Sequence, residues 1–260
     1  MKSRIKAVFF DIDGTLVSFT SHTVPDSARR AIERLREQGI KVFIATGRLL
    51  KHASVVGDIE VDGYITVNGG YCITSLGEKI FEQSIPRSTV ERVIDLSQER
   101  GFDVAVMTQQ DMYVTGYGER VMKIANMISI MPQLADVREV AATQSVIQMC
   151  PYVGEEQERE LMAELPDCAS SRWIDTFMDL NVKGIDKSVG AREVMRYYGL
   201  TMEEAMAFGD GGNDVSIVRD VAVGVAMGNA CEELKSVADY ITSSVDEDGV
   251  SRALEHFGLI

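Results

Sequence analysis

The chain has 260 residues, and 45% of them are hydrophobic, so it can bury the core of one large domain or of two modest ones. This composition argues against an intrinsically disordered protein. The 40 acidic residues against 26 basic ones give a formal net charge of -14, which argues against nucleic acid or an anionic membrane as the main partner. A local site with Lys, Arg and a divalent cation can still bind an anion, because exposed charges more than about 10 Å apart are largely screened.

The four cysteines, Cys72, Cys150, Cys168 and Cys231, show neither a CxxC pair nor the spacing of metal ligands. We therefore expect free thiols in a reducing compartment. The apolar run before Asp11 is too short for a signal peptide, and no apolar stretch of 18 residues occurs. These patterns predict a soluble cytoplasmic protein, and none of them indicates an oligomeric state.

The first predicted strand covers residues 7–10 and is followed by two carboxylates. Its Ala-Val-Phe-Phe sequence is typical of a strand buried on both faces of a parallel sheet, whose carboxyl end lies at the binding crevice. If extended backbone continues, Asp11 and Asp13 lie on the same side, and Gly14 allows a sharp turn away from a ligand. The same residues alone are also typical of an ordinary turn. Buried carboxylates, however, need a cation.

A β-α-β unit is predicted next. A helix begins at Pro25-Asp26-Ser27, and a strand over residues 40–45 leads to Thr46-Gly47-Arg48. A further strand over residues 63–67 ends at Asn68-Gly69-Gly70. Because such strands are parallel, we expect the three strand ends to meet at one edge of the sheet. Thr46-Gly47-Arg48 is compatible with a plain helix cap, or with a hydroxyl and a backbone N–H that bind an anion.

From about residue 80 the pattern becomes less regular. We predict helices over residues 90–99, 121–130 and 155–165, strands over 102–107, 111–115 and 146–150, and a strand pair over 171–182. The opening pattern then resumes. We therefore predict an α/β fold in which a Rossmann-like parallel-sheet core domain, residues 1–80 and 186–260, carries an inserted α+β cap domain, residues 81–185.

The core pattern resumes with an amphipathic helix that begins near Lys187. A cation at a helix N-terminus is electrostatically unfavourable, so a nearby anion explains Lys187 better than a solvated position does, and Lys183 is the competing candidate. A strand over residues 205–208 then leads into Gly209-Asp210-Gly211-Gly212-Asn213-Asp214. Further strands are predicted over residues 221–227 and 239–242, and further helices over 231–237 and 250–257.

The glycine-rich loop at residues 209–214 indicates backbone that comes close to a ligand or a metal. Glycine loses more backbone entropy on folding than other residues, so three of them are costly in an ordinary turn. The loop also supplies two acids and an amide. Asp, Asn and backbone oxygens are hard ligands that suit Mg²⁺, which commonly binds one or two carboxylates plus a substrate phosphate.

Four separated motifs, Asp11-Ile12-Asp13-Gly14-Thr15, Thr46-Gly47-Arg48, Lys187 and the loop at 209–214, occur in an order that resembles the haloacid dehalogenase (HAD) superfamily. The long insertion and the Gly-Val-Ala-Met-Gly-Asn sequence at residues 224–229 are similar to its Cof-type branch, subfamily IIB, with a C2B cap. This resemblance implies a Mg²⁺-dependent hydrolase of small phosphate monoesters, often sugar phosphates. Its partner would be a small phosphorylated metabolite.

Carried over by motif, the resemblance implies that Asp11 is the nucleophile that forms an aspartyl phosphate. Asp13 would be the acid/base that protonates the leaving oxygen and then activates water. Mg²⁺ would be held by Asp11, the backbone carbonyl of Asp13, and Asp210, while Asp214 would support the metal or Lys187. The phosphate oxygens would meet Thr46, the N–H groups of Ile12 and Gly47, Lys187 and Asn213.

Two other functions stay open at this point. A phosphotransferase or phosphomutase would use the same acids and pass the phosphate to a sugar hydroxyl instead of water. A non-catalytic phosphate-binding protein would keep the pocket, although binding alone needs no nucleophile with an acid/base partner. The fold does not identify the substrate. Candidates for substrate specificity in the predicted cap are Arg172, Trp173, Asp175 and Asp179.

Overall fold

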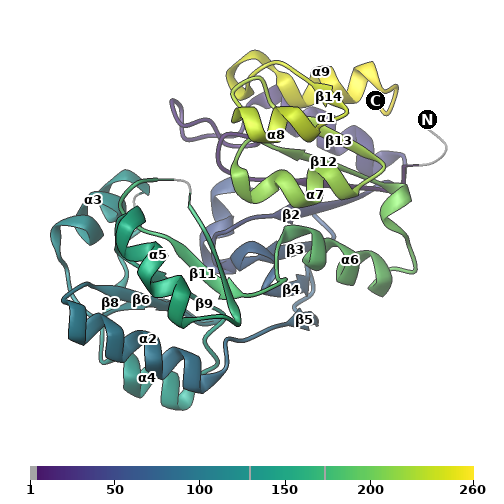
Figure 1. The fold of residues 1–260 in the computed structure, drawn as a ribbon. Coiled ribbons are helices and arrows are strands. Elements are labelled where there is room, and N and C mark those ends of the chain that lie inside the picture. The colour runs from purple at the N-terminus through teal and green to yellow at the C-terminus, as the bar shows by residue number, and fades with distance from the viewer. Residues whose placement is uncertain (1–4, 129, 173) are drawn as a thin grey trace. The chain divides into compact units, whose positions relative to one another are not determined.

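The computed structural model describes residues 5–128, 130–172 and 174–260. The chain divides into two compact units, one made of Met1–Phe81 and Asp186–Ile260 and the other of Glu82–Ile185. We call them the core unit and the inserted unit (Figure 1). Among the described residues, none of the helices combines the length and the apolar composition that crossing a bilayer requires.

The core unit contains an eight-stranded sheet in the order β14-β13-β12-β1-β2-β3-β4-β5. Neighbouring strands from β14 to β3 are parallel, and β4 pairs antiparallel with β3. The strands are β1 (Ala7–Phe10), β2 (Lys41–Ala45), β3 (Gly63–Thr66), β4 (Tyr71–Thr74), β5 (Lys79–Glu82), β12 (Ala205–Gly209), β13 (Val223–Ala226) and β14 (Tyr240–Ile241).

Helices cover both faces of this sheet (Figure 1). Alternate residues of β1 therefore pack into two different apolar cores, one on each face. Val8 and Phe10 pack with α1 and α9, whereas Ala7 and Phe9 pack with α6, α7 and α8. The rings of Phe10 and Phe208 stack with centroids 4.9 Å apart. The helices of the core unit are α1 (Asp26–Glu37), α6 (Lys187–Tyr197), α7 (Val215–Asp220), α8 (Glu232–Val237) and α9 (Gly249–His256).

The inserted unit has its own six-stranded sheet, in the order β10-β11-β9-β6-β7-β8. Its apolar core joins residues of that sheet to α2, α4 and α5. The strands are β6 (Val104–Met107), β7 (Met112–Val114), β8 (Gln133–Leu134), β9 (Gln148–Pro151), β10 (Cys168–Ser171) and β11 (Asp179–Val182), and the helices are α2 (Arg87–Arg100), α3 (Glu119–Ile128), α4 (Val137–Thr143) and α5 (Glu155–Glu164).

Most predicted elements of the core unit are confirmed within a few residues, but several short elements of the two units were not predicted. The missed elements are β4, β5, β8, α4 and α7, all of seven residues or fewer. Elements of that length rarely show a full helical or strand period. The strand pair expected over residues 171–182 is displaced, because its first strand, β10, ends at Ser171. The Cys-Ala-Ser-Ser sequence of β10 has no alternation of apolar and polar residues that could predict it.

A close approach between β13 and α7 gives a test of core packing. A Cβ atom at Gly224 would lie 2.0 Å from the carbonyl oxygen of Val218. We expect Gly224→Ala to lower the free energy of unfolding by about 2 kcal/mol, because a packed core resists added volume. The matched control is Gly212→Ala, whose Cβ would meet no atom within 4 Å and should leave stability unchanged or slightly raised. Urea unfolding followed by circular dichroism measures both, and equal stability of the two variants would contradict the packing argument.

Candidate active site

The predicted motifs lie at the carboxyl ends of adjacent parallel strands. Asp11 follows β1, and its N–H still donates to the carbonyl of Phe208 in β12 at 3.1 Å. Thr46 follows β2, and Asp210 follows β12. Ligands of open α/β sheets bind at this edge. The sheet therefore brings together side chains that are far apart in the sequence.

A buried lysine joins two of these segments. Lys187 is the first residue of α6 and is fully buried, and its Nζ donates to Oδ1 of Asp11 and to Oδ1 of Asp214, both at 2.6 Å. Burial alone lowers the pKa of Lys187, but the two carboxylates raise it above its ordinary value. Burial raises the pKa of Asp11 well above 3.8, and Lys187 opposes that shift. Lys187 is therefore a charged partner of two buried acids. These acids are the nearby anions that its position at a helix start predicts.

Asp210 is held mainly by neutral groups. Thr15 Oγ1 donates to its Oδ1 at 3.1 Å, and Asn229 Nδ2 lies 3.4 Å from its Oδ2. Gly14 packs so closely that a Cβ there would lie 2.2 Å from Oδ2 of Asp210. Burial, followed by the charge of Asp214, raises the pKa of Asp210 from 3.8 to about 7. A partly buried carboxylate with this electrostatic environment favours the arrival of a cation.

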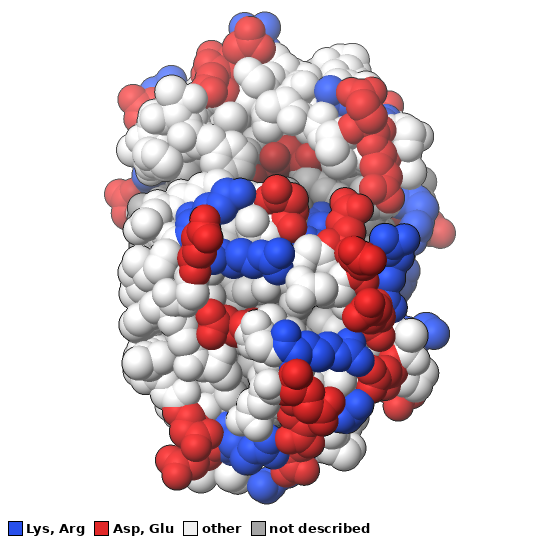
Figure 2. Space-filling model, turned by 60° about the vertical axis from the view of Figure 1, so that its left-hand side comes forward, with Lys and Arg blue, Asp and Glu red and all other residues white. Residues whose placement is uncertain are grey.

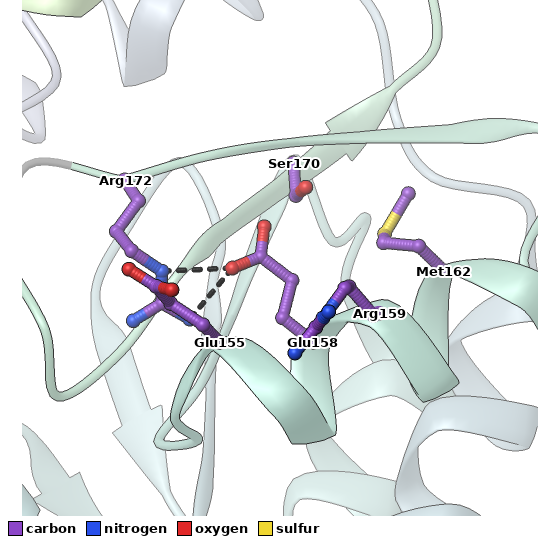
Figure 3. A pocket seen from close by; sticks show the side chains of 6 residues that line it. All are labelled: Glu155, Glu158, Arg159, Met162, Ser170 and Arg172. Carbon is purple, nitrogen blue, oxygen red and sulfur yellow. Dashed lines mark hydrogen bonds and ion pairs between the residues drawn. The ribbon is translucent and has the colours of Figure 1, made fainter.

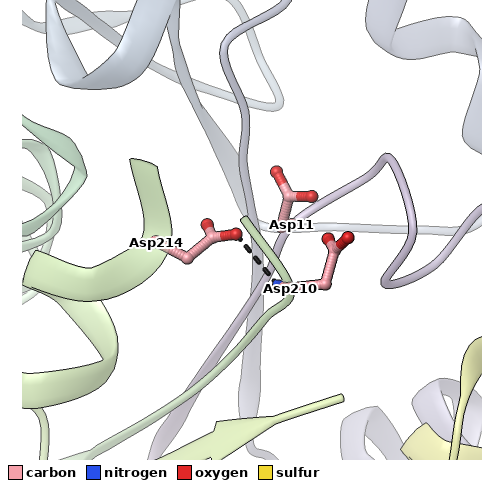
Figure 4. A group of neighbouring side chains, drawn as sticks. All are labelled: Asp11, Asp210 and Asp214. Carbon is pink, nitrogen blue, oxygen red and sulfur yellow. Dashed lines mark hydrogen bonds between the residues drawn. The ribbon is translucent and has the colours of Figure 1, made fainter. Parts of the chain in front are cut away.

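The carboxylates of Asp11, Asp210 and Asp214 have oxygens within 4.8 Å of one another (Figure 4). Hard oxygen donors at this spacing fit a divalent cation such as Mg²⁺. Both carboxylate oxygens of Asp214 already accept hydrogen bonds. Its Oδ1 accepts from Lys187, and its Oδ2 accepts from the N–H groups of Asp210 and Gly211 at 3.1 and 3.0 Å. The acidic cluster is therefore a candidate divalent-metal site, with Asp11 and Asp210 more available than Asp214.

The side chain of Asp13 makes a different contact from that of Asp11. Arg48 donates from Nη2 and Nε to the two carboxylate oxygens of Asp13 at 2.6 and 2.7 Å. The regular strand ends at Phe10, and the carbonyl of Ile12 accepts the N–H of Val17 at 2.7 Å in a tight turn. The strand alternation used to align the two acids therefore stops before Asp13, and Arg48 sets the direction of its carboxylate instead.

The predicted phosphate donors surround the same strand ends. Thr46 is buried, and its Oγ1 accepts the N–H of Arg48 at 3.1 Å. Asn213 Nδ2 donates to Oδ1 of Asn68 at 3.0 Å. Asn68 and Asn229 were not among the predicted site residues. The strand-end sequence Asn68-Gly69-Gly70 was the available signal for the first, and the sequence at 224–229 for the second.

Of the cap residues predicted to set specificity, the three that the structure describes each contact a different partner. Arg172 donates to Glu158 at 2.7 Å and lines a hollow of about 580 Å³ beside α5 (Figure 3). Asp175 pairs with Lys123 at 3.4 Å, and buried Asp179 accepts from Gln148 Nε2 at 2.8 Å. Trp173 lies outside the described residues.

One face of the protein shows a mixed surface charge. On the face in Figure 2, Lys and Arg side chains alternate with Asp and Glu. No continuous basic patch is seen among the described residues of that face.

Comparison with known proteins gives the family. Residues 8–254 match the model of the haloacid dehalogenase-like hydrolases. YkrA of Bacillus subtilis (strain 168) is 30% identical over 260 residues, which cover 98% of each chain. BT1666 of Bacteroides thetaiotaomicron, a phosphatase of the HAD superfamily, has a TM-score of 0.93 and 36% identity over 98% of this chain and 96% of its own. The HAD subclass IIB sugar phosphatase BT4131 has a TM-score of 0.87 and 39% identity over 98% and 100%.

These matches span nearly the whole chain and confirm both the predicted family and the predicted α/β fold class with a second, inserted sheet. The chain therefore belongs to the haloacid dehalogenase-like hydrolases, as a phosphatase of that family that acts on small phosphate monoesters.

Proposed function

We propose that the protein is a Mg²⁺-dependent phosphatase of small phosphorylated metabolites, sugar phosphates above all, and that it works through an aspartyl phosphate at Asp11. The observation that carries this proposal is the buried Asp11 carboxylate, which Lys187 holds within the acidic cluster at the carboxyl ends of β1 and β12. The likeness to a sugar phosphatase, BT4131, supports the choice of substrate class.

In the first step, the oxygen of Asp11 that does not bond to Lys187 attacks phosphorus. The bond from phosphorus to the ester oxygen breaks, its electron pair goes to that oxygen, and protonated Asp13 supplies the proton. In the second step, Asp13 takes a proton from water, which attacks the aspartyl phosphate. Inorganic phosphate leaves and the Asp11 carboxylate is restored.

Mg²⁺, when bound by Asp11, the carbonyl of Asp13 and Asp210, would supply charge that offsets the repulsion between a phosphate dianion and the carboxylates. Arg48 holds the Asp13 carboxylate in a two-bond ion pair, which sets its direction but favours its ionised form, so one of these bonds has to open before Asp13 carries the proton. Donors at fixed positions stabilise the charge that spreads over the transferred group. In this proposal those donors are Thr46, the N–H groups of Ile12 and Gly47, Lys187 and Asn213.

The proposed activity predicts phosphate release from a panel of hexose and pentose phosphates, nucleotides and other small monoesters. We expect release with Mg²⁺, strongest for the sugar phosphates, and none above background with excess chelator. A colorimetric phosphate assay measures it, with sugar acceptors added in parallel to detect transfer. A folded, Mg²⁺-binding protein that releases no phosphate from any ester would contradict the hydrolase proposal.

The nucleophile assignment predicts that Asp11→Asn lowers kcat by about 10³-fold or more, because an amide cannot form the covalent intermediate. The change in circular dichroism should be small, because Asn keeps the shape of the side chain. The matched control is Asp58→Asn, since Asp58 is exposed and pairs only with Arg29 among the contacts described for it. The control should keep wild-type kcat, and substantial turnover by Asp11→Asn would rule out Asp11 as the nucleophile.

The raised pKa of Asp210 predicts how metal-free stability depends on pH. Between 3.8 and about 7 the folded protein keeps a proton on Asp210 that the unfolded chain has lost, so this group's contribution to stability falls as pH rises through that window. In chelator, Asp210→Asn should therefore gain stability relative to wild type between pH 5 and pH 8, on the order of 2 kcal/mol. Mg²⁺ at pH 8 should stabilise wild type more than the variant.

Thermal unfolding at the two pH values, with chelator or Mg²⁺, measures this effect. Asp58→Asn serves again as control, because Asp58 is exposed and does not belong to the acidic cluster. A difference between wild type and Asp210→Asn that stays constant from pH 5 to pH 8 would show that Asp210 is not the partly buried acid with a raised pKa described above.

A further inference from the structure

The turn after β3 has an unusual backbone. Val67, Asn68 and Gly69 have positive φ angles of 52°, 51° and 96° in succession. A positive φ is uncommon for residues other than glycine and is an outlier for a β-branched residue such as Val67. Strained backbone persists where its surroundings hold it, and it is concentrated at functional sites. The contacts of this turn therefore need an explanation.

The turn is held by two of the segments that build the site. The N–H groups of Val67 and Asn68 donate to the carbonyls of Arg48 and Thr46 at 3.2 and 3.1 Å. Gly69 lies against the start of α6, where a Cβ would be 1.9 Å from the carbonyl oxygen of Asp186. The strained turn thus lies between the loop after β2 and the helix that begins with Lys187.

The side chain of Asn68 reaches a third segment. It is 4% exposed, and its Oδ1 accepts a hydrogen bond from Nδ2 of Asn213 at 3.0 Å. The same amide lies against Gly47, where a Cβ would be 3.0 Å from Oδ1 and 3.3 Å from Nδ2 of Asn68. The Asn68 side chain is therefore packed against Gly47 and hydrogen-bonded to the amide of Asn213.

We propose that Asn68 is a positioning residue, which holds the amide of Asn213 in the orientation that binds a phosphate oxygen. An amide nitrogen carries two hydrogens, and engaging one of them fixes the direction of the other. A donor fixed in advance binds the transferred group without reorganisation. The left-handed backbone at Asn68 is what places its Oδ1 against Asn213. This inference rests on the proposed phosphatase function, because it assigns a role within the same phosphate site.

Substitution by glycine separates the side chain from the backbone. Glycine adopts a positive φ without strain, so Asn68→Gly deletes the amide alone, whereas Asn68→Ala also strains the turn. Asn68→Gly should keep a near-wild-type melting temperature and raise the Kd of inorganic phosphate for the Mg²⁺-loaded protein by roughly 5- to 10-fold, measured by titration calorimetry. Asn68→Ala should weaken phosphate binding to the same extent and also melt at a lower temperature.

A double-mutant cycle tests whether Asn68 acts through Asn213. In an Asn213→Ala background, Asn68→Gly should change the phosphate Kd by less than about 2-fold, because the amide that it orients is already gone. The matched control is Asp248→Gly, at another residue of the core unit with a positive φ but with an exposed side chain, which should leave the phosphate Kd unchanged. Additive effects of Asn68→Gly and Asn213→Ala would overturn the positioning role.

The outcomes separate this inference from the proposed function. If wild type binds phosphate and Asn68→Gly binds it equally well, the positioning role is wrong while the phosphatase function stands. If wild type neither binds inorganic phosphate nor hydrolyses phosphate esters, the proposed function is wrong and this inference falls with it.

Discussion

The fully buried ammonium group of Lys187, bonded to Asp11 and Asp214, is the interaction on which the rest of the site depends. It joins three segments: the end of β1, the start of α6 and the loop after β12. Two carboxylates could not both stay ionised there without a cation. Burial disfavours the charged form of each carboxylate, and the two negative charges repel each other. Removing one partner from such a buried pair typically costs about 3–5 kcal/mol, so the ion pair ties the chemistry of the site to the integrity of the fold.

The parallel sheet supplies the geometry within which this charge cluster can form. Both faces of β1 are buried, so its direction and register leave little freedom to the residue that follows it. Side chains beyond the strand ends are then set by specific contacts. Arg48 directs Asp13, Thr15 and Asn229 bond to Asp210, and backbone N–H groups hold Asp214. Each acid thus has a different environment, which is a requirement for giving chemically identical groups different roles.

Sequence reasoning was most successful where one physical rule dominates. The apolar run at 7–10 predicted a buried strand, which is β1, and Lys187 at a helix start favoured a nearby anion, which the structure supplies twice. It was weaker where several segments act together. The pairing of Asp13 with Arg48 and the left-handed turn at Asn68 depend on contacts between distant loops that no local period encodes. Short elements such as α7 gain their stability from packing against the sheet, so their own sequence is a poor guide.

The centre of the core sheet joins residues that lie far apart in the sequence. Ala7 of β1 lies in register with Ala205 of β12, and the whole inserted unit comes between them in the sequence. During synthesis from the N-terminus, β1 can pair with β2 early, but its other edge stays open until β12 has left the ribosome. The loop that bears Asp210 and Asp214 follows directly on that late strand. The charge cluster thus forms only when the sheet closes, so an unfinished chain exposes an apolar strand edge and has no assembled site.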